Sequence, residues 1–280
     1  MDNWRIFILI DNLMKTSPHQ SFSPKKSLGQ NFLICNWAIS DIIDAAHLTR
    51  NDLVLEIGSG TGVLTKALAP RAKKIIAIEK DEKLAQNLTD NLRKEGITNV
   101  HIITGDILKD MPQFTDSYKV VANIPYYLTG RLLRLLLEEC IHKPSLIAFT
   151  IQKEVAERMI ALPPHENLLS ISVQAYGKPA IIKNIPASCF SPKPNVDSAI
   201  ITIADISDSF FIGHKIDSKD FFHIIRCAFS RKRKILANTL GNIADKHLIE
   251  RILKDTNLNL LIRPQELSLD QWAYLVSRLI

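Results

Sequence analysis

Cysteine is scarce in this sequence and is never clustered. Four cysteines occur among 280 residues, at Cys35, Cys140, Cys189 and Cys227, and no two of them form a C-x-x-C pair. This spacing argues against a disulfide framework and against a zinc site built from cysteines, so a reducing compartment is the simplest expectation. The eight histidines show no ligand spacing such as H-E-x-x-H, and we therefore expect no metal ion.

Long apolar runs are also missing. Residues 4–10 are mostly apolar, but Arg5 interrupts them and Asp11 ends them. The run is too short for a membrane span and lacks the small-residue cleavage site of a secretory signal. A single arginine and two aspartates within residues 1–24 do not fit a mitochondrial transit peptide. We expect residues 1–24 to be a flexible extension or the product of an upstream start codon, and the protein to be cytoplasmic with no membrane partner.

The charge of the chain is positive and unevenly spread. The net charge is +6, with a pI of about 9.1, which favours an anionic partner. Residues 217–280 hold 11 lysines and arginines against 7 aspartates and glutamates, a net charge of +4. A chain of this length buries about three quarters of its unfolded surface, enough for an average domain plus a small second one.

A glycine turn between an apolar strand and a helix predicts a nucleotide site. Residues 53–57 are mostly apolar, Gly58-Ser59-Gly60-Thr61-Gly62 follows, and a helical pattern comes next. Glycines let the backbone approach a ligand closely at the start of a helix. The dinucleotide fingerprint G-x-G-x-x-G is not met, because Val63 stands at its third glycine position. The pattern E-x-G-x-G-x-G suits S-adenosylmethionine better than a nicotinamide dinucleotide.

The next two predicted strands also end on carboxylates. Residues 75–78 lead to Glu79, which lies 21 residues after Gly58, and residues 100–104 lead to Gly105-Asp106. Glu79 can accept hydrogen bonds from ribose hydroxyls, and Asp106 can accept from an adenine amine. Either acid alone could equally be the capping residue of a helix. Because successive parallel strands end at one edge of a sheet, the two acids together favour a ligand site.

A fourth strand, residues 118–122, delivers Asn123-Ile124-Pro125-Tyr126 to the same edge. The amide of Asn123 offers an uncharged acceptor, Pro125 holds the neighbouring carbonyl oxygens in place, and Tyr126 adds a flat ring. This combination suits a planar base that carries an amino group. Taken alone, the tetrapeptide would be a proline turn with an asparagine cap; its place after three ligand-suited strand ends favours the base site.

The chain continues with a fifth strand over residues 146–151, a helix over 154–160, and strands over 181–185 and 199–203 that form a closing hairpin. The loop before the last strand begins at Phe190 and contains two prolines that keep it extended. Phe190 could cover the second face of a base stacked on Tyr126, or it could be an ordinary core residue beside a rigid turn.

Two clusters of cations are candidates for RNA contacts. Lys25 and Lys26 precede a glycine and two amides, and could meet phosphates from a loop that covers a ligand. Arg231, Lys232, Arg233 and Lys234 open a helical pattern after a polar stretch, residues 205–218, where we place a domain boundary. Both clusters could also be solvated faces.

These motifs occur together, and in the same order, in one family. Over residues 25–280 the sequence resembles the KsgA (RsmA) family of ribosomal RNA adenine dimethyltransferases. The matching stretches are KKSLGQNFL, EIGSGTG, Glu79, Gly105-Asp106, NIPYY, FSPKPNVDS, FSRKRKILANTL and RPQELSLDQW. NIPY with F-x-P-x-P-x-V is specific to this superfamily, and the C-terminal runs favour KsgA over the erythromycin-resistance relatives. The chain departs from the family pattern at Cys35, where aspartate is usual, and at Glu166-Asn167, where Tyr-Gly is usual.

The resemblance implies an α/β, Rossmann-like S-adenosylmethionine-dependent methyltransferase fold over residues 25–208 and a small helical RNA-binding domain over residues 209–280. It also implies the roles of single residues. For the cofactor, Asn31 and Leu33 would contact the methionine part, Gly58 and Gly60 would lie against the cofactor, Glu79 would bind the ribose and Asp106 would bind the adenine amine. For the target base, Asn123 and the Pro125 carbonyl would hold the amine beside the cofactor, and Tyr126 and Phe190 would stack on the ring.

The implied activity is dimethylation of two adjacent adenosines near the 3′ end of small-subunit ribosomal RNA, late in assembly of the 30S particle. We expect a monomer with no obligate protein partner. Two alternatives stay open: a large-subunit RNA methyltransferase of the erythromycin-resistance type, and a non-catalytic RNA-binding assembly factor on the same fold. Intact Asn123 and glycine turn argue against the second alternative.

Overall fold

The computed structural model describes residues 24–25, 28–231 and 234–280, so the expected N-terminal extension lies almost wholly outside the described residues. The chain divides into two compact units. The first runs up to Ala156 and resumes over Ala180–Ile206, and the second contains Glu157–Pro179 and Ser207–Ile280. No helix within the described ranges is long and apolar enough to span a membrane.

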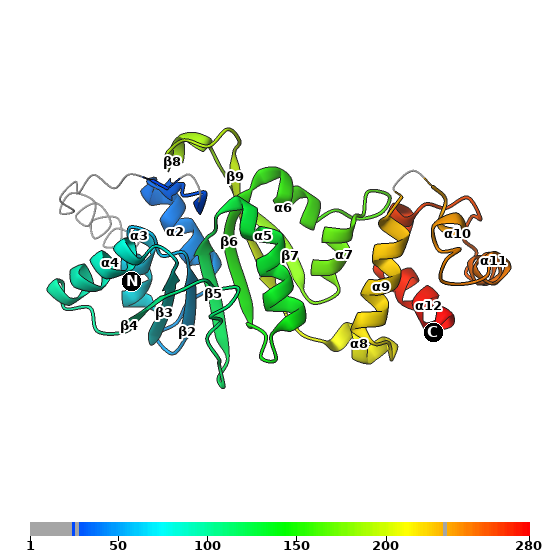
Figure 1. The fold of residues 1–280 in the computed structure, drawn as a ribbon, viewed down its shortest axis with the longest axis horizontal. Coiled ribbons are helices and arrows are strands. Elements are labelled where there is room, and N and C mark those ends of the chain that lie inside the picture. The colour runs from blue at the N-terminus through cyan, green and yellow to red at the C-terminus, as the bar shows by residue number, and fades with distance from the viewer. Residues whose placement is uncertain (1–23, 26–27, 232–233) are drawn as a thin grey trace. The chain divides into compact units, whose positions relative to one another are not determined.

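A seven-stranded sheet forms the first unit, and it confirms the expected α/β class (Figure 1). Its strands run in the order β4 (Val100–Thr104), β3 (Lys74–Glu79), β2 (Leu53–Ile57), β5 (Tyr118–Asn123), β6 (Leu146–Gln152), β9 (Ser198–Ala204) and β7 (Lys178–Ile185). The first five are parallel, and β9 is antiparallel to β6. β9 and β7 are neighbours, as the sequence predicted.

The central strands are apolar along nearly their whole length because both faces of the sheet are covered. Val54, Leu55, Val120 and Val121 are all fully buried. The helices that surround the sheet are α2 (Asn36–Ala45), α3 (Val63–Leu68), α4 (Glu82–Lys94), α5 (Thr129–Arg134) and α6 (Lys153–Met159), of which α6 runs into the second unit. α2 packs against β6 and β9, and α4 packs against β3 and β4.

Helix α4 shows how local sequence sets these elements. Its apolar residues Leu84, Leu88 and Leu92 recur every four positions and are buried on one face. Asp81 caps the helix by accepting a hydrogen bond from the backbone N–H of Lys83, a contact of the kind that contributes about 1 kcal/mol. The cap matters to the site because Asp81 comes two residues after Glu79.

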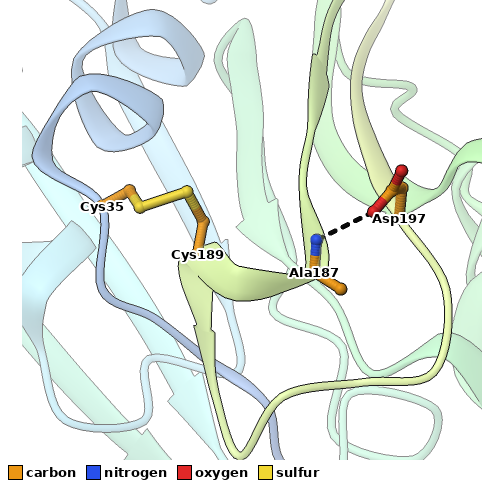
Figure 2. The surroundings of a disulfide bond; sticks show 4 residues. All are labelled: Cys35, Ala187, Cys189 and Asp197. Carbon is orange, nitrogen blue, oxygen red and sulfur yellow. Dashed lines mark hydrogen bonds between the residues drawn. A yellow bond between two sulfur atoms is a disulfide. The ribbon is translucent and has the colours of Figure 1, made fainter.

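A separate two-stranded sheet brings distant parts of the first unit together. Strand β1 (Phe32–Leu33) pairs with β8 (Phe190–Ser191), with Leu33 opposite Phe190. Cys35, two residues after Leu33, and Cys189, directly before Phe190, form a disulfide with their Cα atoms 5.1 Å apart (Figure 2). The expectation of no disulfide was therefore wrong. Antiparallel pairing brought together two cysteines that are 154 residues apart in sequence, which no spacing rule could show.

The second unit is helical, with α7 (Leu168–Gln174), α8 (Ser209–His214), α9 (Ser218–Phe229), α10 (Leu236–Thr239), α11 (Lys246–Asp255) and α12 (Leu269–Leu279). Aromatic rings from α8 and α9 pack on Tyr176 at centroid distances of 5.0 to 5.9 Å. The predicted boundary at residue 208 lies close to Ser207, but it missed residues 157–179. α7 packs on α9, and sequence order could not reveal that contact.

Substitution of Gly62 tests how the glycine turn packs against Leu88 of helix α4. Both Gly62 and Gly96 have positive φ values, +81° and +69°, so alanine at either position costs about 1–2 kcal/mol of backbone strain. A Cβ on Gly62 would also collide with the buried Leu88 side chain, whereas a Cβ on Gly96 would meet nothing within 4 Å. Gly62→Ala should lower the free energy of unfolding by about 1–3 kcal/mol more than Gly96→Ala in urea titrations. Equal losses would contradict the packing described.

Candidate active site

One pocket lies in the first unit at the carboxyl edge of β2, β3, β4 and β5. Its wall contains every residue that the sequence predicted to bind cofactor or target base. These residues are Asn31, Leu33, Gly58, Gly60, Glu79, Asp106, Asn123, Pro125, Tyr126 and Phe190. The parallel register explains the gathering, because Glu56 of β2 lies opposite Val121 of β5, so the chain leaves both strands at the same level.

The glycine turn after β2 presents backbone to this pocket. The N–H of Gly58 donates to the Ile78 carbonyl at 2.8 Å, which fixes the turn to β3. Gly60 has φ +54°, and a Cβ there would lie 3.0 Å from the ring of Phe32. The turn therefore presents bare backbone to the pocket at Gly58 and Gly60, and the ring of Phe32 in β1 closes it on one side.

Glu79 is buried and is tied to the glycine turn. Its Oε2 accepts from Gly60 N–H and its Oε1 accepts from Asp81 N–H, each at 2.8 Å. Burial raises the pKa of Glu79, and these two backbone hydrogen bonds oppose the rise. A carboxylate has about four acceptor positions, so two bonds leave it able to accept from a ligand.

Asp106 is paired with a lysine that the sequence reading missed. Lys80 Nζ lies 2.8 Å from Asp106 Oδ2, and Leu108 N–H donates to Asp106 Oδ1 at 3.1 Å. The lysine contact holds the pKa of Asp106 below its usual value. Lys80 also lines the pocket, and its place directly after Glu79 was the signal that could have identified it.

Glu56 is a second residue that the sequence reading did not assign to the site. It lines the pocket and its side chain is 1% exposed. The Thr65 hydroxyl is near enough to lower its pKa, but neither carboxyl oxygen has a hydrogen bond of good geometry among the described residues. Burial, together with the nearby Glu79 charge, raises its pKa to about 8. A buried carboxyl without a well-formed hydrogen bond at a pocket wall is suited to a cationic ligand group. Its position as the acid of E-x-G-x-G-x-G was the available signal.

Asn123 is held by residues 28–33, which line the pocket and are called the covering segment below. Its Nδ2 donates to the backbone carbonyl of Asn31 at 3.0 Å. The amide nitrogen is thereby engaged, and Oδ1 is the acceptor that this side chain offers to the pocket. Because Asn31 precedes β1, the hydrogen bond connects the covering segment directly to the end of β5.

The rest of the NIPY turn is equally fixed. The Pro125 carbonyl accepts from Leu128 N–H at 2.9 Å, and the Tyr126 hydroxyl lies 2.8 Å from Ser198 Oγ on β9. Burial raises the pKa of Tyr126. Phe190 both lines the pocket and packs in the hydrophobic core, where it is 3% exposed. The sequence left open whether Phe190 covers the target base or is a core residue, and its position allows both.

Three of the predicted RNA-binding cations are described, and none of the three lines the pocket. Lys25 Nζ forms an ion pair with Asp81 at 2.8 Å, close to Glu79 in sequence. Arg231 and Lys234 are exposed on the second unit and are joined by a backbone hydrogen bond of 3.0 Å. Lys26, Lys232 and Arg233 fall outside the described residues. Within the part of the chain that is described, no group of three or more acidic, histidine or cysteine side chains could hold a metal ion.

The buried carboxyl of Glu56 makes stability depend on pH. Between about pH 4.5 and 8 the folded chain keeps a proton on Glu56 that the unfolded chain releases, so the free energy of unfolding falls as pH rises. Glu56→Gln should flatten this fall in urea titrations at several pH values, whereas Asp116→Asn, at an exposed loop position, should not. An unchanged pH profile in Glu56→Gln would show that this carboxyl does not hold the proton.

Comparison with known proteins places this arrangement in a family. The family described as ribosomal RNA adenine dimethylase matches residues 21–279. A ribosomal RNA small subunit methyltransferase A from Dehalococcoides mccartyi is 37% identical over 257 residues, covering 90% of this chain and 87% of that protein. The protein of the same name from Bacillus licheniformis is 39% identical over 273 residues, covering 92% of each chain.

Solved structures show the same fold. A dimethyladenosine transferase from Plasmodium falciparum has a TM-score of 0.73 and 27% identity, covering 87% of this chain and 95% of that one. The 23S rRNA methyltransferase ErmE has a TM-score of 0.72 and 23% identity, covering 89% of this chain and 99% of that one, a likeness that concerns the fold alone. The chain therefore belongs to the ribosomal RNA adenine dimethylase family and is an S-adenosylmethionine-dependent methyltransferase.

Proposed function

We propose that this enzyme dimethylates two adjacent adenosines near the 3′ end of small-subunit ribosomal RNA, within a late 30S assembly particle in the cytoplasm. The relatives from Dehalococcoides mccartyi and Bacillus licheniformis, both named for the small subunit, support this target. The observation that carries the proposal is the Asn123 amide, whose nitrogen is bound to the Asn31 carbonyl so that its oxygen serves the pocket.

The residues at the carboxyl edge of the sheet fit the cofactor. S-adenosylmethionine supplies a methyl group on a positively charged sulfur. Glu56, whose carboxyl is buried at the pocket wall, suits the ammonium group of its methionine part, and Glu79 keeps acceptor capacity for the ribose hydroxyls. The cradle at Gly60, which a side chain would fill, leaves room for close backbone contact.

Three further residues complete this half of the pocket. Asn31 and Leu33 line it from the covering segment, where they would contact the methionine part. Asp106 would accept from the adenine amine of the cofactor. Its Oδ2 is held by Lys80 and its Oδ1 by Leu108 N–H, so we propose that one of the remaining lone pairs makes this contact.

The target amine is a poor nucleophile because its lone pair is delocalised into adenine. Asn123 Oδ1, together with the Pro125 carbonyl, would accept its two hydrogens and turn the lone pair toward the methyl group. Leu128 N–H occupies one lone pair of the Pro125 oxygen, and the second would serve the target amine. The reaction then requires alignment more than a strong base, and orientation of two bound reactants supplies roughly 7–11 kcal/mol of the barrier. The proton that the methylated amine must lose is strongly acidic and passes to water.

The target base must leave its stack to reach this pocket, at a cost of about a few kcal/mol. Tyr126 and Phe190 would offset that cost by stacking, which contributes about 1–3 kcal/mol per base. The hydrogen bond between the Tyr126 and Ser198 hydroxyls supports the role, because it fixes the ring to β9. Exposed Arg231 and Lys234 would meet RNA phosphates together with Lys232 and Arg233, and the enzyme would act as a monomer without an obligate protein partner.

The direct test is incubation with small subunits that lack the modification, followed by mass spectrometry of the RNA. Two adjacent dimethyladenosines near the 3′ end of small-subunit RNA are the expected product. Methylation of large-subunit RNA instead would favour the erythromycin-resistance type of activity. Absence of methyl transfer to either subunit, with cofactor bound, would favour a non-catalytic assembly role.

Asn123→Ala should lower the rate of methyl transfer by about 100-fold, because the target amine loses its fixed acceptor. Cofactor affinity, measured by calorimetry, should stay nearly unchanged. Asn99→Ala is the matched control, since Asn99 also donates to backbone carbonyls but lies outside the pocket wall; it should lower stability without slowing transfer. Equal losses of rate and cofactor affinity in Asn123→Ala would show that the residue is structural.

Neutralising Arg231, Lys232, Arg233 and Lys234 with glutamine should weaken RNA binding and reduce its salt dependence. Each lost phosphate contact removes about 0.7–0.9 from the slope of log affinity against log salt. The double variant Arg251→Gln and Lys254→Gln, on exposed positions of α11, is the control and should leave the slope unchanged. A wild-type slope in the first variant would mean that this run is only a solvated surface.

A further inference from the structure

The Cys35–Cys189 disulfide joins the two walls of the pocket by a covalent bond. Leu33, two residues before Cys35, lines the pocket from the segment that covers it, and Phe190, directly after Cys189, lines it from the other side. Leu33 and Phe190 are opposite each other in the β1–β8 pair. The disulfide, drawn in Figure 2, therefore lies close in sequence to residues of both the proposed cofactor wall and the proposed target-base wall.

The β1–β8 sheet has few backbone contacts of its own, although the side chains of Leu33 and Phe190 also pack in the hydrophobic core. Each strand has two residues, and the pair is separate from the seven-stranded sheet. The backbone adds one further bond, from Ile34 N–H to the Cys189 carbonyl at 2.8 Å. Two-stranded pairs of this kind are marginal on their own, so a covalent bond at their end has a large effect on how well they are ordered.

The two cysteines are anchored to different parts of the first unit. The Cys35 carbonyl accepts from Ala38 N–H at 3.1 Å at the start of α2. On the other side, Cys189 N–H donates to the Pro186 carbonyl at 2.9 Å. Ala187 N–H donates to Asp197 Oδ1, also at 2.9 Å (Figure 2). Backbone hydrogen bonds thus hold Cys35 at the start of α2 and Cys189 in the segment before β8. The disulfide links these two parts of the first unit.

We propose that Cys35 and Cys189 are positioning residues of the active site, and that their oxidation state sets the affinity of the enzyme for cofactor and RNA. In the disulfide form β1 and β8 are held in register, with Leu33 and Phe190 in place. In the dithiol form the pair must order itself during binding, and that ordering lowers affinity. The inference rests on the proposed function, because it concerns the walls of the same site.

The exchange uses a small-molecule thiol and its disulfide. A thiolate attacks one sulfur of the Cys35–Cys189 bond, and a second thiol completes the reaction. The protein gains two electrons and two protons as two thiols, and the small thiols become one disulfide. Cys35 is partly exposed whereas Cys189 is 4% exposed, so attack at Cys35 with Cys189 as the leaving group is the accessible route. Intracellular disulfides are commonly redox-sensing rather than structural, which reconciles the bond with an enzyme proposed to act on ribosome assembly.

The experiment compares the full-length enzyme in oxidised and dithiothreitol-reduced forms. Thiol titration verifies each form, since Cys140 and Cys227 are free in both. Cofactor affinity is measured by calorimetry, and the KM and kcat for methyl transfer are measured on small subunits lacking the modification. Reduction should weaken cofactor affinity and raise KM for both substrates by about tenfold, with kcat changed by less than about twofold. Reoxidation should restore both values.

Two double variants serve as matched controls. Cys35→Ser/Cys189→Ser should behave as the reduced enzyme and should not respond to dithiothreitol. Cys140→Ser/Cys227→Ser retains the disulfide and should respond as the wild type does. Equal affinity and KM in the oxidised and reduced wild type would overturn the proposal, even if the melting temperature falls. If neither form transfers methyl groups but reduction still weakens cofactor affinity, the proposed function would be refuted instead.

Discussion

The hydrogen bond from Asn123 Nδ2 to the Asn31 carbonyl is the contact on which the site depends. It joins the end of a central strand to the segment that covers the pocket, 92 residues earlier in the chain. It also occupies one of the two N–H groups of the amide and fixes the orientation of the side chain, which leaves Oδ1 as its acceptor. The parallel sheet makes this contact possible, because β2 and β5 end side by side and bring the glycine turn and the NIPY turn to one wall.

Much of this arrangement could be predicted from sequence, because it follows from short-range rules. Apolar runs of five or six residues identified β2, β4 and β5 to within one residue. Parallel strands share a carboxyl edge, so the residues after them, such as Glu79 and Asn123, could be assigned to one site before any coordinates. The residue roles remain proposals, and the structure adds to them the bonds that orient each side chain.

What could not be predicted came from contacts between distant segments. The disulfide depends on the pairing of β1 with β8, and strands of two residues cannot be recognised from sequence. Residues 157–179 join the helical unit through packing of α7 on α9, which no polar linker marks. Glu56 belonged to the predicted E-x-G-x-G-x-G pattern, but its full burial at the pocket wall became visible only in the structure. Lys25 forms an ion pair with Asp81, a contact that the sequence did not suggest, and its expected role toward phosphate stays a prediction.

The most direct measurement of the central claim is a crystal structure of the enzyme with adenosine and a cofactor analogue that has no transferable methyl group. We predict that Asn123 Nδ2 keeps its bond to the Asn31 carbonyl, while Asn123 Oδ1 lies about 3 Å from the exocyclic nitrogen of adenosine. The adenine ring would lie on Tyr126, with its amine directed toward the analogue. An adenine bound with its amine away from Asn123, or an Asn123 amide turned to donate to the ligand, would contradict the account.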